Sequence, residues 1–76
     1  MIVSYRIDQV SFDQQFLYLQ VNGNSFKVKL DQASPKLKAA TEMHRNFFKV
    51  SPSGYGLHWP LIDEDLSIEF LMKAAE

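Results

Sequence analysis

Residues Phe16 to Leu30 read Phe-Leu-Tyr-Leu-Gln-Val-Asn-Gly-Asn-Ser-Phe-Lys-Val-Lys-Leu, with two alternating runs on either side of Asn22-Gly23. Asn-Gly is the preferred pair for a two-residue type I′ turn, because both turn residues need a positive φ. With that loop, Leu19 faces Phe26 across the hairpin. The stretch therefore predicts an antiparallel β-hairpin with strands at 16–21 and 25–30.

This register sorts the side chains into two faces. A shift by one residue would mix the two sets, which is costly when one face is buried. We expect the apolar face in the core, and it carries Leu17, Leu19, Val21, Phe26, Val28 and Leu30. The reverse face is mixed aromatic and cationic, and it carries Phe16, Tyr18, Gln20, Ser25, Lys27 and Lys29.

The reverse face has two interpretations. Either the C-terminal helix of the same chain covers it, or it stays open for a partner. Tyr and Phe are enriched in protein interfaces, so the composition of this face fits the second interpretation as well as the first.

Before and after the hairpin the pattern changes twice. Residues 2–10 alternate like a strand, with Tyr5 and Ile7 on one face, and residues 12–15 are typical of the turn that follows. Beyond the hairpin, Ser34-Pro35 predicts a helix start, with Ser as N-cap and Pro at the first helical position. Thr41 is placed to cap a second short helical turn at 42–46.

The last third of the chain predicts two strands and a helix. Residues 48–51 and 56–59 are strand-like, and Pro60 ends the second strand because it has no N–H for a ladder. Ser67 is placed to cap a helix at 68–75 with an apolar stripe. The fold class is α+β, a mainly antiparallel sheet in the order β-β-β-α-β-β-α with two or three short helices packed against it.

Composition limits the function classes. The chain has 76 residues, 46% of them hydrophobic and 22% charged, which predicts a single domain spanning 1–76. The absence of cysteine excludes disulfides and thiolate metal sites. No apolar run reaches the roughly 20 residues that a membrane span needs, and we expect a cytoplasmic protein without membrane contact.

Net charge is −1, with +3 over residues 1–50 and −4 over residues 51–76. A free-standing nucleic-acid binder usually has a strongly basic balance, which this chain lacks.

One short stretch holds the only Trp, one of the two His and two of the three Gly. It reads Gly54-Tyr55-Gly56-Leu57-His58-Trp59-Pro60, followed by Leu61-Ile62-Asp63-Glu64-Asp65-Leu66-Ser67 and Leu71. This pattern resembles the C-terminal signature of a family of short bacterial proteins, the domain-of-unknown-function family 2442. The resemblance extends upstream through Arg45-Asn46-Phe47 and Ser34-Pro35 to the hairpin, where the family often has Asp-Gly in place of Asn22-Gly23.

The resemblance implies a small α+β fold without an established activity. Family members often look like partners of another short bacterial protein in the same operon, in an arrangement that suggests toxin–antitoxin pairs. Some members carry a helix-turn-helix after this domain. Since the present sequence shows none up to Glu76, the resemblance implies no DNA-reading activity here.

The signature also contains groups that are capable of chemistry. His58 with Asp63 and Asp65 suggests a metal site, but zinc needs three or four convergent ligands, and this spacing does not supply them. Adjacent acids in a turn point in different directions and do not converge on one substrate. We expect His58 to be a strand residue and the acids to hold the loop before Ser67 by accepting backbone N–H bonds. The sequence predicts no catalytic residue, no metal ligand and no cofactor.

The aromatic residues of the signature have different expected roles. Trp59 is predicted to pack in the core with its indole N–H bonded to a carbonyl. Tyr55 lies between Gly54 and Gly56 in a turn and is predicted to be exposed, which suits an interface anchor. The candidate interface residues are therefore Phe16, Tyr18, Lys27, Lys29 and Tyr55. The candidate structural residues of the signature are Gly54, Gly56, His58, Trp59, Pro60, Asp63, Asp65 and Ser67.

The resulting hypothesis is a non-enzymatic module that binds another protein, either an antitoxin-like or regulatory partner of a co-encoded protein or a homo-oligomer. The alternative is an accessory regulator that contacts nucleic acid through a basic patch on the hairpin and first helix. That patch consists of Lys27, Lys29, Lys36, Lys38 and Arg45, and such contacts weaken steeply with salt.

Overall fold

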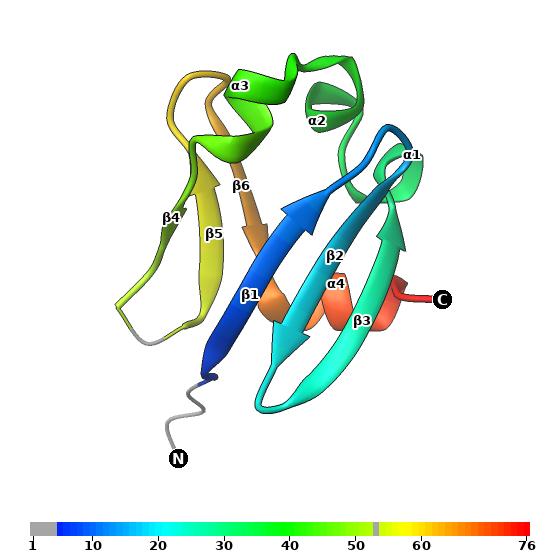
Figure 1. Ribbon diagram of the computed structural model, residues 1–76. Helices are drawn as coiled ribbons and strands as arrows, with labels where there is room; N and C mark the ends of the chain where they lie inside the picture. Colours follow the sequence, from blue (N-terminus) through cyan, green and yellow to red (C-terminus); the bar gives the residue numbers. More distant parts are fainter. Residues whose placement is uncertain (1–4, 53) are drawn as a thin grey trace.

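The computed structural model describes residues 5–52 and 54–76 (Figure 1). Two three-stranded antiparallel sheets, β1-β2-β3 and β4-β5-β6, are joined by short helices. The elements in chain order are β1 (Ile7–Phe12), β2 (Phe16–Val21), β3 (Asn24–Lys29), α1 (Leu30–Ala33), α2 (Pro35–Ala39), α3 (Glu42–Asn46), β4 (Lys49–Val50), β5 (Gly56–Trp59), β6 (Glu64–Ser67) and α4 (Ile68–Ala74).

The predicted hairpin is confirmed in its turn and in its register. Asn22 and Gly23 have φ values of 50° and 83°, as a type I′ turn requires. Leu19 pairs with Phe26 and Leu17 with Val28. The α+β class and the antiparallel pairing are also as predicted.

The core lies between the first sheet and the elements behind it. Figure 1 shows α4 behind β1-β2-β3, with α1, α2 and α3 beyond one end of that sheet. The buried hydrophobic residues come from both sheets and from α1, α2 and α4: Leu17, Leu19, Val21, Val28, Leu30, Ala33, Leu37, Leu57, Trp59, Ile68 and Leu71.

Aromatic rings connect the two sheets. Phe12 at the end of β1 lies 6.3 Å from Trp59 at the end of β5, centroid to centroid, and Phe48 lies 6.4 Å from Phe12 and 6.3 Å from Trp59. Such tilted and edge-to-face pairs add about 0.5–1.5 kcal/mol beyond their buried area. The two sheets therefore share one core.

The first strand differs from its prediction at both ends. Residues 2–4 of the predicted strand lie outside the described residues, and β1 continues to Phe12 because Phe12 packs against the core. The register shifts between Ile7 and Gln9, which indicates a β-bulge. Asp8 lies in this bulge and accepts hydrogen bonds from Arg6 Nε at 2.8 Å and from the Gly23 N–H at 3.0 Å, so the bulge supports the hairpin turn.

The helices follow their predicted caps. The Ser34 hydroxyl accepts the N–H of Leu37, the Thr41 hydroxyl that of His44, and the Ser67 hydroxyl that of Phe70. The sequence did not predict α1. This helix forms because buried Leu30 ends the strand ladder and the Leu30 carbonyl accepts the Ser34 N–H at 2.9 Å.

The largest difference from the sequence prediction is β6. Glu64–Ser67 was predicted as a loop, but it pairs with β5 so that Asp65 lies opposite His58 and Ser67 opposite Gly56. The second sheet thus has three strands. Ser53, in the predicted turn between β4 and β5, lies outside the described residues. Within the described part of the chain, no helix has the length and apolar composition needed to cross a membrane.

Candidate functional site

Four of the predicted interface residues lie together on one surface. Phe16 and Tyr18 of β2 are half-buried, Lys27 and Lys29 of β3 are exposed, and the pairs Phe16/Lys29 and Tyr18/Lys27 are directly opposite. We call this side of β1-β2-β3 the outer face. Among the described residues no helix covers the outer face, because α4 packs on the other side and α1–α3 lie beyond the end of the sheet (Figure 1).

Asp13 orders the aromatic part of this face. Its carboxylate accepts the Tyr18 hydroxyl proton at 2.5 Å and the N–H groups of Gln15 and Phe16 at 2.8 and 2.7 Å. The hydrogen bond from Tyr18 and those from the two N–H groups lower the pKa of Asp13, and the same contact with Asp13 raises the pKa of Tyr18. The Tyr18 ring is thereby tied to the β1–β2 turn.

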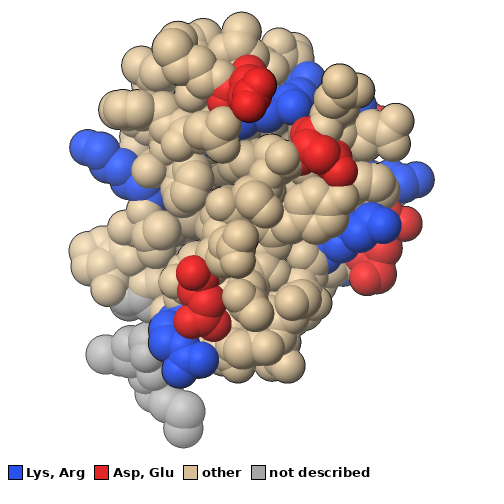
Figure 2. Space-filling model, in the orientation of Figure 1, with Lys and Arg blue, Asp and Glu red and all other residues tan. Residues whose placement is uncertain are grey.

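Lys27 orders the other aromatic residue. Its Nζ lies 4.3 Å from the centroid of the Phe16 ring, a cation–π contact, and the Phe16 and Tyr18 ring centroids are 6.1 Å apart. Beside them is a groove of about 320 Å³ that also includes Gln20, Ser25 and Glu76. Figure 2 shows that most of the surface on this side of the molecule is uncharged and that the charged side chains lie in small separate groups.

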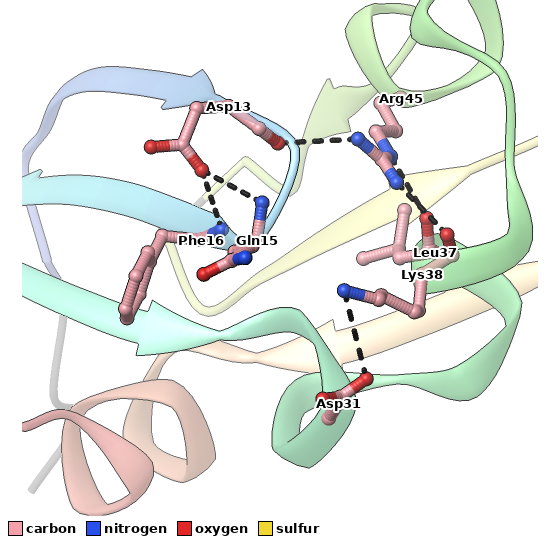
Figure 3. Close-up of polar contacts among 7 residues, drawn as sticks. All are labelled: Asp13, Gln15, Phe16, Asp31, Leu37, Lys38 and Arg45. Atoms are coloured by element: carbon pink, nitrogen blue, oxygen red, sulfur yellow. Dashed lines mark hydrogen bonds and ion pairs between the residues drawn. The ribbon is translucent and has the colours of Figure 1, made fainter.

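Arg45 does not belong to a basic surface patch. Its guanidinium donates to the carbonyls of Leu37, Lys38 and Asp13 at 2.9, 2.9 and 3.1 Å, as Figure 3 shows. The side chain therefore closes the C-terminal end of α2 and ties it to the β1–β2 turn. Its own carbonyl accepts the Trp59 indole N–H at 2.9 Å.

The two lysines of α2 also have partners. Lys36 Nζ donates to the Asp63 carbonyl at 3.0 Å, and Lys38 Nζ lies 3.8 Å from the Asp31 carboxylate. Of the predicted basic patch, only Lys27 and Lys29 lie on the outer face. The five residues therefore do not form one basic surface.

Tyr55 is exposed, as predicted, but it lies on the second sheet. Its side chain lines a groove of about 570 Å³ with Val50, Pro52 and His58, and this groove shares no lining residue with the groove on the first sheet. Tyr55 and the outer face are thus two separate surfaces.

His58 and Asp65 are brought together by β6. His58 Nδ1 lies 2.7 Å from Asp65 Oδ1, and the side chains are 42% and 73% exposed. Lys49 of β4 lies opposite His58 on the other side. His58 is a strand residue, as predicted, and its ring is both exposed and hydrogen-bonded.

The other signature residues shape the backbone. Gly54 has a φ of 68°, and a Cβ at this position would lie 1.9 Å from the Tyr5 carbonyl oxygen. A Cβ on Gly56 would lie 3.0 Å from the Leu66 carbonyl oxygen. Trp59 is fully buried with its N–H bonded, as predicted, and β5 ends directly before Pro60.

The predicted role of the acids is wrong in its details. Asp63 contributes a left-handed backbone with a φ of 52° and its carbonyl, while the Asp65 carboxylate bonds to His58. The carboxylate that accepts polar hydrogens at this turn belongs to Glu64, which receives the buried Ser34 hydroxyl at 2.5 Å and the Asp65 N–H at 3.0 Å.

Two residues of the outer face were not predicted from the sequence. Asp13 was assigned only to a turn, although an Asp before Gln-Gln-Phe16 is typical of a side chain that accepts nearby N–H bonds. Glu76 reaches β3 through tertiary structure, which no local signal predicts. Among residues 5–52 and 54–76, no group of three His, Cys, Asp or Glu residues is placed to hold a metal ion.

The fold and its surface define a small α+β domain. The glycines and the tryptophan of the signature shape the backbone of the second sheet, and the first sheet has an ordered aromatic–cationic face. Residues 7–76 match the family described as Protein of unknown function (DUF2442), and the chain belongs to that family. Comparison with curated proteins and with solved structures found no match.

Proposed function

We propose that this protein is a cytoplasmic, non-enzymatic module that binds another protein through the outer face of β1-β2-β3. The partner is a co-encoded protein, to which this chain stands as an antitoxin-like or regulatory counterpart. The observation that carries the proposal is the open face with Phe16 and Tyr18 beside Lys27 and Lys29.

The order of this face supports the proposal. The Tyr18 hydroxyl is fixed by Asp13, and the Phe16 ring is fixed by Lys27. Side chains that are ordered before binding lose less entropy on association, where each immobilised side chain costs about 0.5–1.5 kcal/mol. A face of this kind is suited to a partner that brings apolar and acidic groups.

The arrangement of the polar groups also favours binding over catalysis. Among the described residues, the His58–Asp65 pair is the only histidine–carboxylate contact, and it lies exposed on a sheet surface. General acid–base chemistry needs groups that converge on a bound substrate, and nucleophilic chemistry needs an activated nucleophile next to the base. The hydrogen bonds of the described residues place no serine hydroxyl against His58.

The test is co-purification from the native host with matched variants. Tagged wild-type protein should recover one dominant partner, identified by mass spectrometry. The double variant Phe16→Ser/Lys27→Glu should lose it, while Tyr55→Ser, on the separate surface, should retain it. Thermal unfolding of each variant shows whether the fold is intact.

Three outcomes would contradict the proposal. Loss of the partner only in Tyr55→Ser assigns binding to the second sheet. Recovery of the protein alone, as a monomer, removes partner binding. Recovery of nucleic acid whose binding falls steeply with salt favours the nucleic-acid alternative.

A further inference from the structure

The edge of β3 faces away from β2 with a defined set of backbone groups. Val21 and Asn24 close the two-residue turn and form a hydrogen-bonded pair, so Leu19/Phe26 and Leu17/Val28 do the same. In an antiparallel ladder the residues between these pairs turn their N–H and C=O groups to the other side. On β3 these residues are Ser25, Lys27 and Lys29.

The chain itself pairs with this edge at one point. After α4 ends, Ala75 is extended with φ −66° and ψ 147°, and the Glu76 N–H donates to the Lys27 carbonyl at 2.8 Å. Among the described residues, the N–H groups of Ser25 and Lys29 donate none of the backbone hydrogen bonds found outside the helices and strands. An extended segment with an acidic residue is thus already accommodated at the edge.

The side chains at this edge determine which strand fits. Residues directly opposite each other in a sheet have their side chains on the same face. A strand paired with β3 would place alternate side chains opposite Lys27 and Lys29 on the outer face. Acidic residues at those positions are favourable, because opposite charges stabilise a cross-strand pair and like charges destabilise it.

The same rule argues against a second copy at this edge. Two β3 strands paired around a two-fold axis at Lys27 or Val28 would place lysines of one copy opposite lysines of the other. Edge lysines are a common means by which proteins avoid such self-pairing.

We propose that the edge of β3 takes up an extended segment of the partner protein that carries acidic side chains at alternate positions. This inference rests on the proposed function and adds the mode of binding, which is β-strand addition. The backbone groups of Ser25 and Lys27 and the N–H of Lys29 supply the hydrogen bonds, and the two lysines select the charge. The segment displaces the Glu76 N–H from the Lys27 carbonyl.

The probe is a short acetylated peptide, Thr-Glu-Val-Glu-Val-Glu-Thr amide, whose binding to the full chain is followed by fluorescence anisotropy and by amide NMR shifts. In the predicted pairing the glutamate N–H groups face β3, and the valine N–H groups face away. N-methylation of the glutamates should therefore weaken binding about tenfold or more, since two or three inter-strand hydrogen bonds are lost. N-methylation of the valines is the matched control and should leave binding unchanged.

Variants of the protein test the same point from the other side. Lys29 has a φ of −64°, which proline also adopts, and its N–H faces outward, so Lys29→Pro removes an edge donor without breaking the hairpin. Lys29→Gln removes only the charge. Lys29→Pro should weaken binding several-fold more than Lys29→Gln, and Glu76→Pro, which frees the Lys27 carbonyl, should tighten binding.

Each remaining outcome contradicts strand addition. Equal binding of the two N-methylated peptides indicates attraction by charge alone. An absence of NMR shifts with millimolar peptide at low ionic strength removes the site. A dimer in ultracentrifugation that Lys29→Pro dissociates assigns the edge to a second copy. If the native partner is lost in Phe16→Ser/Lys27→Glu but retained in Lys29→Pro, the proposed function stands and this inference fails.

Discussion

The two sheets of this protein use their unusual residues in opposite ways. In β4-β5-β6 and the turn before β5, two residues that stand out in the sequence, Gly54 and Trp59, are buried and hold the backbone in place. In β1-β2-β3, the fully buried positions are ordinary aliphatic residues, and Phe16, Tyr18, Lys27 and Lys29 lie on the open face. The signature therefore marks a backbone that requires glycine and close packing. The candidate binding surface lies instead on the hairpin, whose sequence alternates regularly.

This difference has a physical cause. A hairpin with a clean alternation of side chains is specified by its pattern alone, so its outer positions are free to vary with function. The second sheet contains two-residue and four-residue strands, which the pattern specifies poorly. Its geometry depends instead on a glycine contact, a buried indole and a capping serine.

The largest expected effect is at Gly54. Gly54→Ala places a Cβ within 1.9 Å of the Tyr5 carbonyl oxygen at a φ of 68°, so the backbone has to move. We expect the free energy of unfolding to fall by about 3 kcal/mol or more, measured by urea denaturation.

Gly23→Ala is the matched control for this prediction. Gly23 also has a positive φ, 83°, but a Cβ there meets only the Arg6 guanidinium at 4.0 Å. The expected loss is the conformational term alone, roughly 1–2 kcal/mol. Equal losses at Gly54 and Gly23 would show that the close approach of Gly54 to the Tyr5 carbonyl contributes nothing to stability. The contrast between the sheets would then weaken.

The next largest effect is expected at Trp59. Trp59→Phe keeps an aromatic ring beside Phe12 and Phe48 but leaves a cavity and deprives the Arg45 carbonyl of its indole donor. A loss of about 2–3 kcal/mol is expected from the cavity and the unpaired carbonyl. Guanidinium denaturation followed by far-UV circular dichroism measures it. Tyr55→Phe, at an exposed position, should change stability by less than about 0.5 kcal/mol.

The sequence predicted the first sheet better than the second for the same reason. The period of two and the Asn22-Gly23 turn determine the register of the hairpin without reference to the rest of the chain. The caps at Ser34, Thr41 and Ser67 are local in the same sense, because each hydroxyl bonds to an N–H three residues on. Local signals therefore predicted the hairpin and the helix starts.

The sequence did not predict the structural features that depend on tertiary contacts. Strand β6 has the sequence Glu-Asp-Leu-Ser, whose polar residues favour a loop, and it becomes a strand because β5 supplies its ladder and Glu64 is held by Ser34. The same holds for Arg45, which the sequence assigned to a basic patch and the fold uses to close α2. The four-residue outer face was predicted from the register, but the contribution of Asp13 to it was not.

A smaller and pH-dependent effect is expected at Asp13. Its folded-state pKa is lowered below the ordinary value of 3.8 by the hydrogen bonds from Tyr18 and from two backbone N–H groups. The ionised carboxylate therefore stabilises the fold above its unfolded pKa, and this contribution disappears as the pH falls through the lower, folded-state pKa. Asp13→Asn should be less stable than wild type at neutral pH, with a smaller loss than Trp59→Phe.

The measurement is thermal unfolding of wild type and Asp13→Asn from about pH 7 down to about pH 2. The difference between the two should shrink toward the acid end. Asp31→Asn, whose carboxylate lies 3.8 Å from Lys38 Nζ, is the control and should be close to wild type in stability at neutral pH. A gap between wild type and Asp13→Asn that is constant with pH would mean that the charge of Asp13 does not order the outer face.

The smallest effect is expected at the His58–Asp65 pair, which is the strictest test of the contrast between the sheets. The pair belongs to the signature, yet both side chains are exposed and their contact joins β5 to β6 only at the surface. Exposed ion pairs contribute about 0–1 kcal/mol, so His58→Gln, Asp65→Asn and the double variant should each lie within about 1 kcal/mol of wild type by urea denaturation. A coupling energy above about 2 kcal/mol in that double-mutant cycle would show that the second sheet also depends on its exposed side chains. In that case the division between a backbone-shaping sheet and a surface-bearing sheet would not hold.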